Sequence, residues 1–316
     1  MQEQHYRTPS KINAFLAING LDSRRALHRL TSVFLPLDLC DELAIAHSND
    51  IAKGGENTPI RTVAKEWSYK ISVEGNEASL ISDQILDKVF QLCSQKYSLT
   101  GYYDIHLLKK IPLQSGLGGG SSDAAALLRF LDNQQQIPLR AHDFMALALR
   151  CGSDVPFFLQ PRPSVVRNFG EIVEPFDTFG GHTVREPSWL LFKPSCGIST
   201  AEAYRCLAQR ASEFYLSEEE TEERLKESLQ SFAEKEPGDW LFYNSFQKLF
   251  VEMFPGITPL LRALKDRHYA CGMSGSGSAW FIPLARGDDG RDAMRQIRNH
   301  LGSAVWISKV SGWSSM

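Results

Sequence analysis

The stretch that organises this chain is Pro112-Leu113-Gln114-Ser115-Gly116-Leu117-Gly118-Gly119-Gly120-Ser121-Ser122. A segment with β-forming residues, 103–111, precedes it, and an alanine- and leucine-rich segment with high helix propensity, 124–131, follows it. The pattern predicts a strand, a glycine loop and a helix N-terminus. Glycines let a backbone approach a bulky group closely, and the first N–H groups and the dipole of a helix attract anions. The stretch therefore predicts a binding site for a di- or triphosphate.

A tight turn is the simpler alternative, because glycines also mark turns. Four glycines within five positions are costly to order, however, since glycine loses more backbone freedom on folding than any other residue. That cost favours phosphate binding, by analogy with known glycine-loop phosphate sites.

The loop differs from three familiar nucleotide-binding sequences. A Walker A motif needs a lysine directly after the glycines, and none follows here. The Rossmann fingerprint fails because residue 121 is serine, and the chain has neither the His-Arg-Asp nor the Asp-Phe-Gly of protein kinases. The loop therefore belongs to another class.

Length and composition narrow the class of protein. The 316 residues suit two domains or one large domain, and 43% hydrophobic and 22% charged residues are ordinary for a globular protein. A net charge of -3 gives no electrostatic footprint for nucleic acid, and no apolar run approaches the roughly 18 residues of a membrane span. The polar start lacks the apolar stretch of a signal peptide, so a cytoplasmic location is expected. The polar, proline-bearing run 179–187 predicts a domain boundary that divides the chain into 1–185 and 186–316.

Cysteine and histidine spacing argues against a transition-metal site. No two cysteines are closer than Cys196 and Cys206, which excludes Cys-x-x-Cys chemistry and zinc spacing. No two histidines stand four positions apart. The cysteines are therefore expected to be buried, reduced thiols.

Hydrophobic periodicity predicts the other elements. Residues 8–20 alternate as a strand whose second face carries Lys11 and Asn13, side chains that a strand start commonly exposes to solvent. Further strands are expected at 30–39, in a pair spanning 43–73 with a loop at 49–59, at 189–193 and at 279–282. Helices are expected at 79–97, 121–132, 141–151, 199–210, 217–235 and 257–265, and the acidic start of 217–235 indicates a solvated face.

Two other short elements stand out. Asp154 lies between a predicted helix end and an apolar run, where an aspartate is more often a turn or cap residue. The segment 272–278 alternates glycine with serine before a predicted strand. Both a turn and a loop whose backbone contacts a ligand remain open for that segment.

Together these pieces resemble the GHMP small-molecule kinases. Three motifs occur in order over almost the whole chain: Pro-Ser-Lys-Ile-Asn at 9–13, the loop at 112–122, and the glycines of 272–277. Within this superfamily the chain is most similar to the 4-diphosphocytidyl-2-C-methyl-D-erythritol kinases. That family carries Pro-Ala-Lys where this chain has Ser10 before the lysine. It also carries Gly-Leu-Gly-Gly-Gly-Ser-Ser, a Gly-Tyr-His segment matching 26–34, and Gly-Ala-Asp-Val-Pro-x-Phe matching 152–158.

The resemblance implies a fold and an activity. The fold is α+β, with an N-terminal ATP-binding and catalytic domain like ribosomal protein S5 domain 2 and a ferredoxin-like C-terminal substrate domain. The activity is ATP-dependent, with Mg²⁺, and phosphorylates the 2-hydroxyl of the methylerythritol unit in the non-mevalonate isoprenoid pathway. The implied partners are small molecules, without nucleic acid or membrane, and the implied state is a monomer or homodimer.

The resemblance also implies catalytic roles. Lys11 and Asp154 form the catalytic pair, with Asp154 as the general base that accepts the hydroxyl proton. Lys11 keeps Asp154 ionised and offsets negative charge during transfer. The loop 112–122 holds the phosphates of ATP, and Ser121 or Ser122 helps to place Mg²⁺.

The implied substrate site comprises four residues. Asn13 lies near the acceptor end, His28 meets the cytosine, Tyr204 covers one side of the base, and Gly275 belongs to the same site. The family tyrosine before the histidine is Leu27 here. Leucine keeps an apolar contact but loses ring stacking, which contributes about 1–3 kcal/mol per base.

Two alternatives share the predicted fold. The first is another GHMP kinase, acting on homoserine, mevalonate or a sugar. The second is a catalytically silent nucleotide-binding protein, which is expected to have lost the lysine or the aspartate. Both Lys11 and Asp154 are present, which favours the enzyme.

Overall fold

The computed structural model describes residues 2–49, 61–64, 67–75, 84–134, 141–176 and 187–314. By its internal contacts the chain forms two compact units, each of which is discontinuous in sequence. The first unit contains Met1–Ser10, Leu39–Leu113 and Gly118–Pro161, and the second contains Lys11–Asp38, Gln114–Leu117 and Arg162–Met316. The predicted boundary between 185 and 186 falls in 177–186, outside the described residues, and stays a prediction.

Two long strands carry the chain through both units. The strand predicted at 8–20 is confirmed as part of β1 (Gln2–Asp22). The segment predicted at 30–39 belongs to β2 (Leu27–Ser48), so the prediction of a separate strand beginning at 43 is wrong. Residues 30–34 of β2 pair with β6 (Ser164–Asn168), and residues 42–48 pair with β5 (Gly101–Lys109). Pairing with β6 near its start and with β5 near its end thus keeps β2 extended through the segment between them, which carries Asp38 and Asp41.

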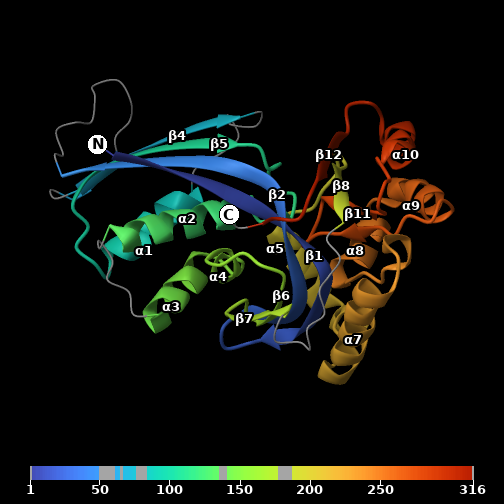
Figure 1. The fold of residues 1–316 in the computed structure, drawn as a ribbon. Helices are drawn as coiled ribbons and strands as arrows, with labels where there is room; N and C mark the ends of the chain where they lie inside the picture. The colour runs from blue at the N-terminus through green and yellow to red at the C-terminus, as the bar shows by residue number, and fades with distance from the viewer. Residues whose placement is uncertain are drawn as a thin grey trace. The chain divides into compact units, whose positions relative to one another are not determined.

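In the first unit, helices cover one face of a mixed sheet (Figure 1). The sheet order is β3 (Arg61–Ala64), β4 (Trp67–Gly75), β5, β2 and β1, with β4 and β5 parallel. The covering helices are α1 (Gln84–Ser94), α2 (Gly119–Asn133), α3 (Ala141–Cys151) and α4 (Val155–Phe158). The helices predicted at 121–132 and 141–151 are confirmed, and the helix predicted at 79–97 is confirmed over 84–94, three residues short of its predicted end. Helix α2 begins two residues earlier than predicted.

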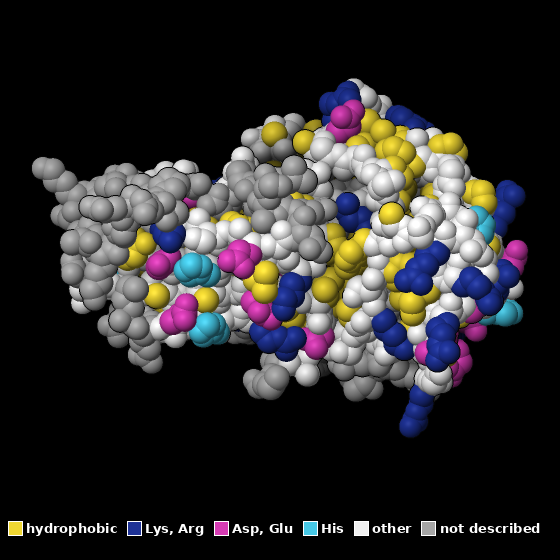
Figure 2. Space-filling view, turned by 90° about the horizontal axis from the view of Figure 1, so that it is seen from above, with side chains coloured by type: hydrophobic (Ala, Val, Ile, Leu, Met, Phe, Trp, Pro, Cys, Tyr) yellow, Lys and Arg dark blue, Asp and Glu magenta, His cyan; other side chains and the backbone are white. Residues whose placement is uncertain are grey.

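The other face of this sheet is polar. Figure 2 looks onto it and shows acidic, basic and histidine side chains mixed together. A groove on this face is lined by polar residues of four strands, among them His5, Arg7, Glu42, Ser72, Glu74 and His106. The sheet therefore has one helix-packed face and one polar face, as is common when antiparallel pairing dominates.

The second unit contains a fully antiparallel sheet. Its order is β10 (Gly272–Met273), β11 (Trp280–Leu284), β8 (Ser188–Lys193) and β12 (Trp306–Val310). With the helices between these strands, this is the β-α-β-β-α-β order expected of a ferredoxin-like domain. The predicted strands at 189–193 and 279–282 are confirmed, whereas β12 was not predicted.

The helices of the second unit follow local signals to different degrees. Predicted helices at 199–210, 217–235 and 257–265 are confirmed as α5 (Thr200–Gln209), α7 (Glu218–Glu234) and α9 (Thr258–Lys265). Ser217 and Glu220 form a capping box at the start of α7, whose acidic first turn is exposed as predicted. Not predicted were α6 (Ala211–Phe214), α8 (Ser245–Met253), α10 (Arg291–Leu301) and the short strands β6, β7 (Ile172–Pro175) and β9 (Tyr243–Asn244).

The six cysteines are free thiols, of which Cys40, Cys93 and Cys151 are buried and the other three are partly exposed. The burial prediction is therefore right for half of them. No helix in the described ranges has the length and apolar character needed to cross a bilayer.

Candidate active site

The glycine loop leads into an open helix N-terminus in the first unit. Gly118 precedes α2 with φ 78°, a left-handed conformation that favours glycine, and its carbonyl accepts the N–H of Ser122 at 3.0 Å. The first N–H groups of α2, from Gly119 onward, have no acceptor within the helix. These groups and the dipole of a 15-residue helix favour an anion at its start, so the predicted phosphate site is compatible with the structure.

A buried charge network lies behind this helix start. The Lys109 ammonium contacts Asp41 and lies 2.8 Å from Asp123, which also accepts a 2.7 Å hydrogen bond from Thr8. Asp41 Oδ1 accepts the backbone N–H of Lys110 at 2.6 Å and the next N–H along the chain at 2.8 Å. Burial raises the pKa of Asp123 to about 6, against the opposing effect of Lys109. The network thereby fixes the chain just before the loop and in the first turn of α2.

This network was not predicted from the sequence. The sequence shows only two adjacent lysines, Lys109 and Lys110, and Asp41 stands far away in the chain. The contact depends on the pairing of β2 with β5, which no local pattern encodes.

In the second unit, the first part of the glycine loop packs against the segment 272–278. A Cβ added to Gly116, which has φ 78°, would lie 2.3 Å from the Ser274 carbonyl oxygen. A Cβ on Gly275 would lie 3.1 Å from the Gly116 Cα. Ser274 Oγ donates to the Gly116 carbonyl at 2.9 Å, and the Ala279 N–H donates to the Ser115 carbonyl at 2.9 Å. The glycines of both loops are thus explained first by close backbone packing against each other.

Lys11 is buried at 2% exposure, so it is not one of the solvated polar residues that are common at strand starts, an alternative that the sequence left open. Its ammonium donates to Asn13 Oδ1 at 2.6 Å and to the Gly116 carbonyl at 2.8 Å, and it lies 4.9 Å from the Phe34 ring centre. Its backbone N–H donates to the Leu117 carbonyl at 2.9 Å. Lys11 therefore holds the first part of the glycine loop through both backbone and side chain.

Asn13 is equally buried, at 3% exposure. Its Oδ1 also accepts the Gly275 N–H at 2.8 Å, and its Nδ2 donates to Ser32 Oγ at 2.9 Å. Asn13 and Lys11 thus bring the three sequence motifs together: the first strand, the glycine loop and the segment 272–278.

The remaining loop residues contribute mainly through the backbone. Ser115 and Leu117 are buried, and Ser115 Oγ accepts the Leu117 N–H at 3.3 Å. Gln114 is exposed with φ 49°, and Pro112 and Leu113 are half-buried. Of the two hydroxyls expected to help place a metal, Ser121 is half-buried and Ser122 is 2% exposed. The described chain contains no cluster of three or more carboxylate, thiol or imidazole groups that could hold a metal by itself.

Asp154 lies in the turn before α4 in the first unit. It is the N-cap residue of α4, but its side chain makes no cap hydrogen bond, and it is half-buried. The turn lies beside the start of α2, since Ser121 Oγ is 3.7 Å from the position of a Cβ on Gly152. Asp154 is therefore on a turn adjacent to the start of α2. Lys11 belongs to the other unit, and the pairing of Lys11 with Asp154 stays a prediction.

His28 belongs to an aromatic cluster of the second unit. Its ring centre lies 4.8 Å from that of Tyr204, and its Nε2 is 2.8 Å from the hydroxyl of Tyr215. Tyr204 in turn packs edge-on against Phe246, with 4.8 Å between ring centres. Burial lowers the pKa of His28, which favours the neutral ring. Leu27 is 49% exposed. The structure brings the predicted His28 and Tyr204 together and adds Tyr215, which had no sequence signal.

Comparison with known proteins agrees with the motifs. The GHMP kinases N terminal domain model matches residues 84–161, and the GHMP kinases C terminal model matches residues 219–303. The 4-diphosphocytidyl-2-C-methyl-D-erythritol kinase of Thermotoga petrophila is 33% identical over 283 residues, which are 88% of this chain and 92% of that relative.

Solved structures confirm the predicted GHMP kinase fold. A crystal structure of 4-(cytidine 5'-diphospho)-2C-methyl-D-erythritol kinase has a TM-score of 0.67 at 23% identity, covering 99% of this chain and 100% of its own. Homoserine kinase from Cytophaga hutchinsonii has a TM-score of 0.66 at 12% identity, covering 99% and 95%. Because the two scores are nearly equal, the fold alone does not separate these activities.

Proposed function

The chain belongs to the GHMP kinases, and within them to the 4-diphosphocytidyl-2-C-methyl-D-erythritol kinases. We propose that it transfers the γ-phosphoryl group of ATP to the 2-hydroxyl of this cytidyl substrate. The reaction is a step of the non-mevalonate isoprenoid pathway. The observation that carries the proposal is the convergence of Lys11, Asn13, Gly116 and Gly275, which joins all three kinase motifs in one hydrogen-bonded cluster. The identity to the Thermotoga petrophila kinase over most of both chains selects the substrate.

The donor phosphates are proposed to bind at the start of α2. Phosphoryl transfer asks a protein mainly for positioning and charge stabilisation. The loop from Gly116 to Ser122 supplies backbone N–H groups and the helix dipole for this purpose. The Lys109 network behind the loop keeps these groups in place.

Mg²⁺ is proposed to accompany ATP. The donor set suits it, because Mg²⁺ is commonly held by phosphates, water and only one or two protein oxygens. Ser121, with its half-buried hydroxyl at the helix start, is the proposed protein ligand. The ion supplies charge neutralisation at the phosphates. The protein's own contribution is to orient those phosphates through the loop.

Asp154 and Lys11 are the proposed catalytic residues. Asp154 accepts the proton of the substrate hydroxyl, for which its position beside the start of α2 is suitable. Lys11 offsets negative charge as the phosphoryl group moves, and its ammonium is already oriented by Gly116 and Asn13. The side-chain amide of Asn13 is already hydrogen-bonded to Lys11, Ser32 and Gly275. Its proposed role near the acceptor is therefore to hold these three residues in position.

The cytidyl group is proposed to bind at His28 and Tyr204. The Tyr204 ring provides a stacking surface, and the neutral His28 ring provides hydrogen-bonding groups. The domain assignment stays part of the proposal, with 1–185 binding ATP and 186–316 contributing substrate contacts. A cytoplasmic location without nucleic-acid or membrane partners is also proposed, because both substrates are multiply charged small molecules. The proposed state is a monomer or homodimer, as the family resemblance implies.

Replacement of Asp154 by asparagine tests the chemistry. Asp154→Asn is expected to lower kcat at least about a hundredfold, because the general base is lost, and to leave ATP affinity near normal. ADP release with the cytidyl substrate and equilibrium binding of ATP measure the two effects. Near wild-type turnover of this variant would refute the assignment.

A panel of acceptors tests the substrate. The wild-type chain is assayed for ADP release with the cytidyl substrate, homoserine, mevalonate and a sugar. Strong turnover of only the first supports the proposal. Preferred turnover of homoserine or mevalonate overturns the substrate, and ATP binding without any acceptor-dependent ADP release indicates a silent nucleotide-binding protein.

A further inference from the structure

We propose that Tyr215 is a positioning residue for the nucleobase site: its hydroxyl donates to Nε2 of His28 and thereby fixes the tautomer in which Nδ1 carries the proton and faces the base as a donor. The inference rests on the proposed function for the identity of the base. The geometry of the pair does not depend on it.

The contact between the two side chains is close and directional. Tyr215 Oη lies 2.8 Å from His28 Nε2, and the two rings meet edge-on, with 5.8 Å between centres and 82° between planes. Among the described residues, Tyr215 is the hydrogen-bond partner of the His28 ring. A neutral imidazole has one donor and one acceptor nitrogen, so the partner at Nε2 determines what Nδ1 can do.

The chemistry of the pair favours the tyrosine as donor. A phenol O–H is more acidic than the N–H of a neutral imidazole, and an imidazole nitrogen is the better acceptor of the two. Burial raises the pKa of Tyr215, so the hydroxyl keeps its proton, and burial lowers the pKa of His28, so the ring stays neutral. The proton of the ring then resides on Nδ1. Cytosine offers a carbonyl oxygen and a ring nitrogen as acceptors for such a donor.

The backbone fixes the position of Tyr215. Its strand-like bridge to Ile18 places it against β1, and the Leu216 N–H donates to the Ile18 carbonyl at 3.0 Å. Its own N–H donates to the Ala211 carbonyl at 2.9 Å and closes helix α6. Backbone hydrogen bonds therefore hold the chain at Tyr215 and at the residue that follows it.

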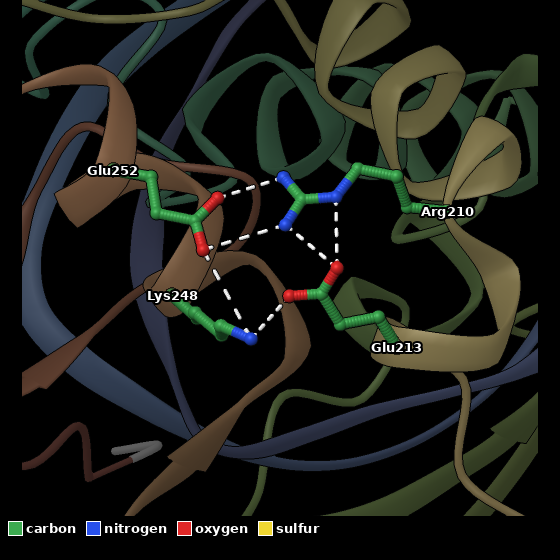
Figure 3. Close-up of polar contacts among 4 residues, drawn as sticks. All are labelled: Arg210, Glu213, Lys248 and Glu252. Atoms are coloured by element: carbon green, nitrogen blue, oxygen red, sulfur yellow. Dashed lines mark hydrogen bonds and ion pairs between the residues drawn. The ribbon is translucent and has the colours of Figure 1, made fainter.

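A ring of four charged side chains holds the helix that precedes Tyr215 (Figure 3). Arg210 lies 2.6 Å from Glu213 and 2.7 Å from Glu252, and Lys248 also contacts both carboxylates. Hydrogen bonds from Lys248 and Arg210 lower the pKa of the Glu213 carboxyl, which keeps it ionised.

The same two cations flank a buried phenylalanine next to Tyr215. The Phe214 ring centre lies 4.7 Å from the Arg210 guanidinium and 5.5 Å from the Lys248 ammonium. A single exposed ion pair contributes little, but a network with shared partners and cation–π contacts restrains its members together. The ring of charges thus ties α6 to α8 and holds Tyr215 in register with His28.

The contact between Tyr215 and His28 matters in this chain because of the residue before His28. The family tyrosine next to the histidine is replaced by the half-exposed Leu27, which cannot stack on a base through an aromatic ring. Tyr204 of α5 and Tyr215, which directly follows α6, both pack against His28 in the second unit. A histidine locked in one tautomer restores part of the recognition that the leucine lacks.

The decisive variant is Tyr215→Phe, which keeps the ring and removes the donor. We expect the KM for the cytidyl substrate to rise about 3- to 10-fold, the range expected for one lost hydrogen bond, with kcat and the KM for ATP nearly unchanged. Tyr269→Phe is the matched control, because it removes a hydroxyl that bonds Asp288 elsewhere in the second unit. The control is expected to leave all three constants unchanged. An unchanged KM in Tyr215→Phe would overturn the proposal.

The tautomer is measured directly in the free protein by nitrogen-15 NMR of the histidine side chains, with His28→Gln identifying the signals. Wild type is expected to show His28 protonated at Nδ1 alone, and Tyr215→Phe a mixture of tautomers. Wild-type protonation at Nε2 would contradict the proposal. Because this measurement needs no substrate, a chain that fails to turn over the cytidyl substrate refutes the proposed function without deciding the tautomer.

Discussion

At the scale of single residues, Ser10 is a buried side chain whose hydroxyl lacks a hydrogen bond. It is fully buried, and among the described residues its hydroxyl has no hydrogen-bond partner. A buried donor without a partner costs about 1–3 kcal/mol of desolvation.

Ser10→Ala is therefore expected to keep or raise the free energy of unfolding, by about 1 kcal/mol, as measured by urea denaturation. Ser164→Ala is the control. Ser164 is equally buried, but its hydroxyl donates to the Arg162 carbonyl at 2.7 Å, so its removal is expected to destabilise the protein. A loss of stability in Ser10→Ala as large as in the control would show that Ser10 has a partner after all.

At the scale of elements, the glycine loop and the segment 272–278 depend on each other. A side chain at Gly116 would both strain a left-handed backbone and press on the Ser274 carbonyl. Left-handed strain for a residue other than glycine is of order 1–3 kcal/mol. Gly287 has a similar φ of 89°, with nothing within 4 Å of an added Cβ.

Gly116→Ala is expected to lower stability more than Gly287→Ala and to raise the KM for ATP at least tenfold. Gly287→Ala separates backbone strain from the clash and is expected to leave the KM for ATP unchanged. Thermal denaturation and ADP-release kinetics measure the two effects. Equal behaviour of the two variants would show that the packing of the loops does not matter for ATP binding.

Elements were predictable where the signal was local. Helix α3 matched its prediction at both ends, because its apolar period is followed directly by Gly152. Helix α10 was missed because most of its eleven residues are polar or charged and only Ala293, Gln296 and Ile297 are buried, so its apolar face is too narrow to stand out in the sequence. The continuation of β2 was missed because it depends on pairing with strands far along the chain.

The site divides in the same way. The glycine loop was predicted as a phosphate site from its own sequence, whereas the roles of Lys11 and His28 were predicted only from the family resemblance, and all three assignments stay predictions. Tyr215 and the Lys109 network act through contacts that exist only after folding, and a lone tyrosine or lysine in the sequence carries no such information.

At the scale of the molecule, one buried network joins four elements of the first unit. Thr8 of β1, Asp41 of β2, Lys109 of β5 and Asp123 of α2 meet in it. Burial raises the pKa of Asp123 from its ordinary 3.8 to about 6. The folded state therefore holds a proton on Asp123 that the unfolded state releases between these values.

Asp123 thus contributes stability that is complete below about pH 4 and is lost as the pH rises through about 6. Relative to Asp123→Asn, wild type is expected to lose stability over this window at up to about 1.4 kcal/mol per pH unit. Urea denaturation of both proteins at several pH values between 4 and 7.5 measures the difference. A difference that does not vary with pH would contradict the raised pKa.

The discontinuity of the second unit also has a consequence during translation. Residues 36–38 of β2 hydrogen-bond with residues 311–313, through Asp38 to Ser311 and Trp313 to Pro36. At about 5–20 residues per second, a ribosome needs roughly 15–55 seconds to reach the second set after the first. For that time a nascent chain displays this strand edge without its partner, and open edges invite pairing with other chains. The emerging protein is therefore most exposed to aggregation, and most dependent on chaperones, over this interval.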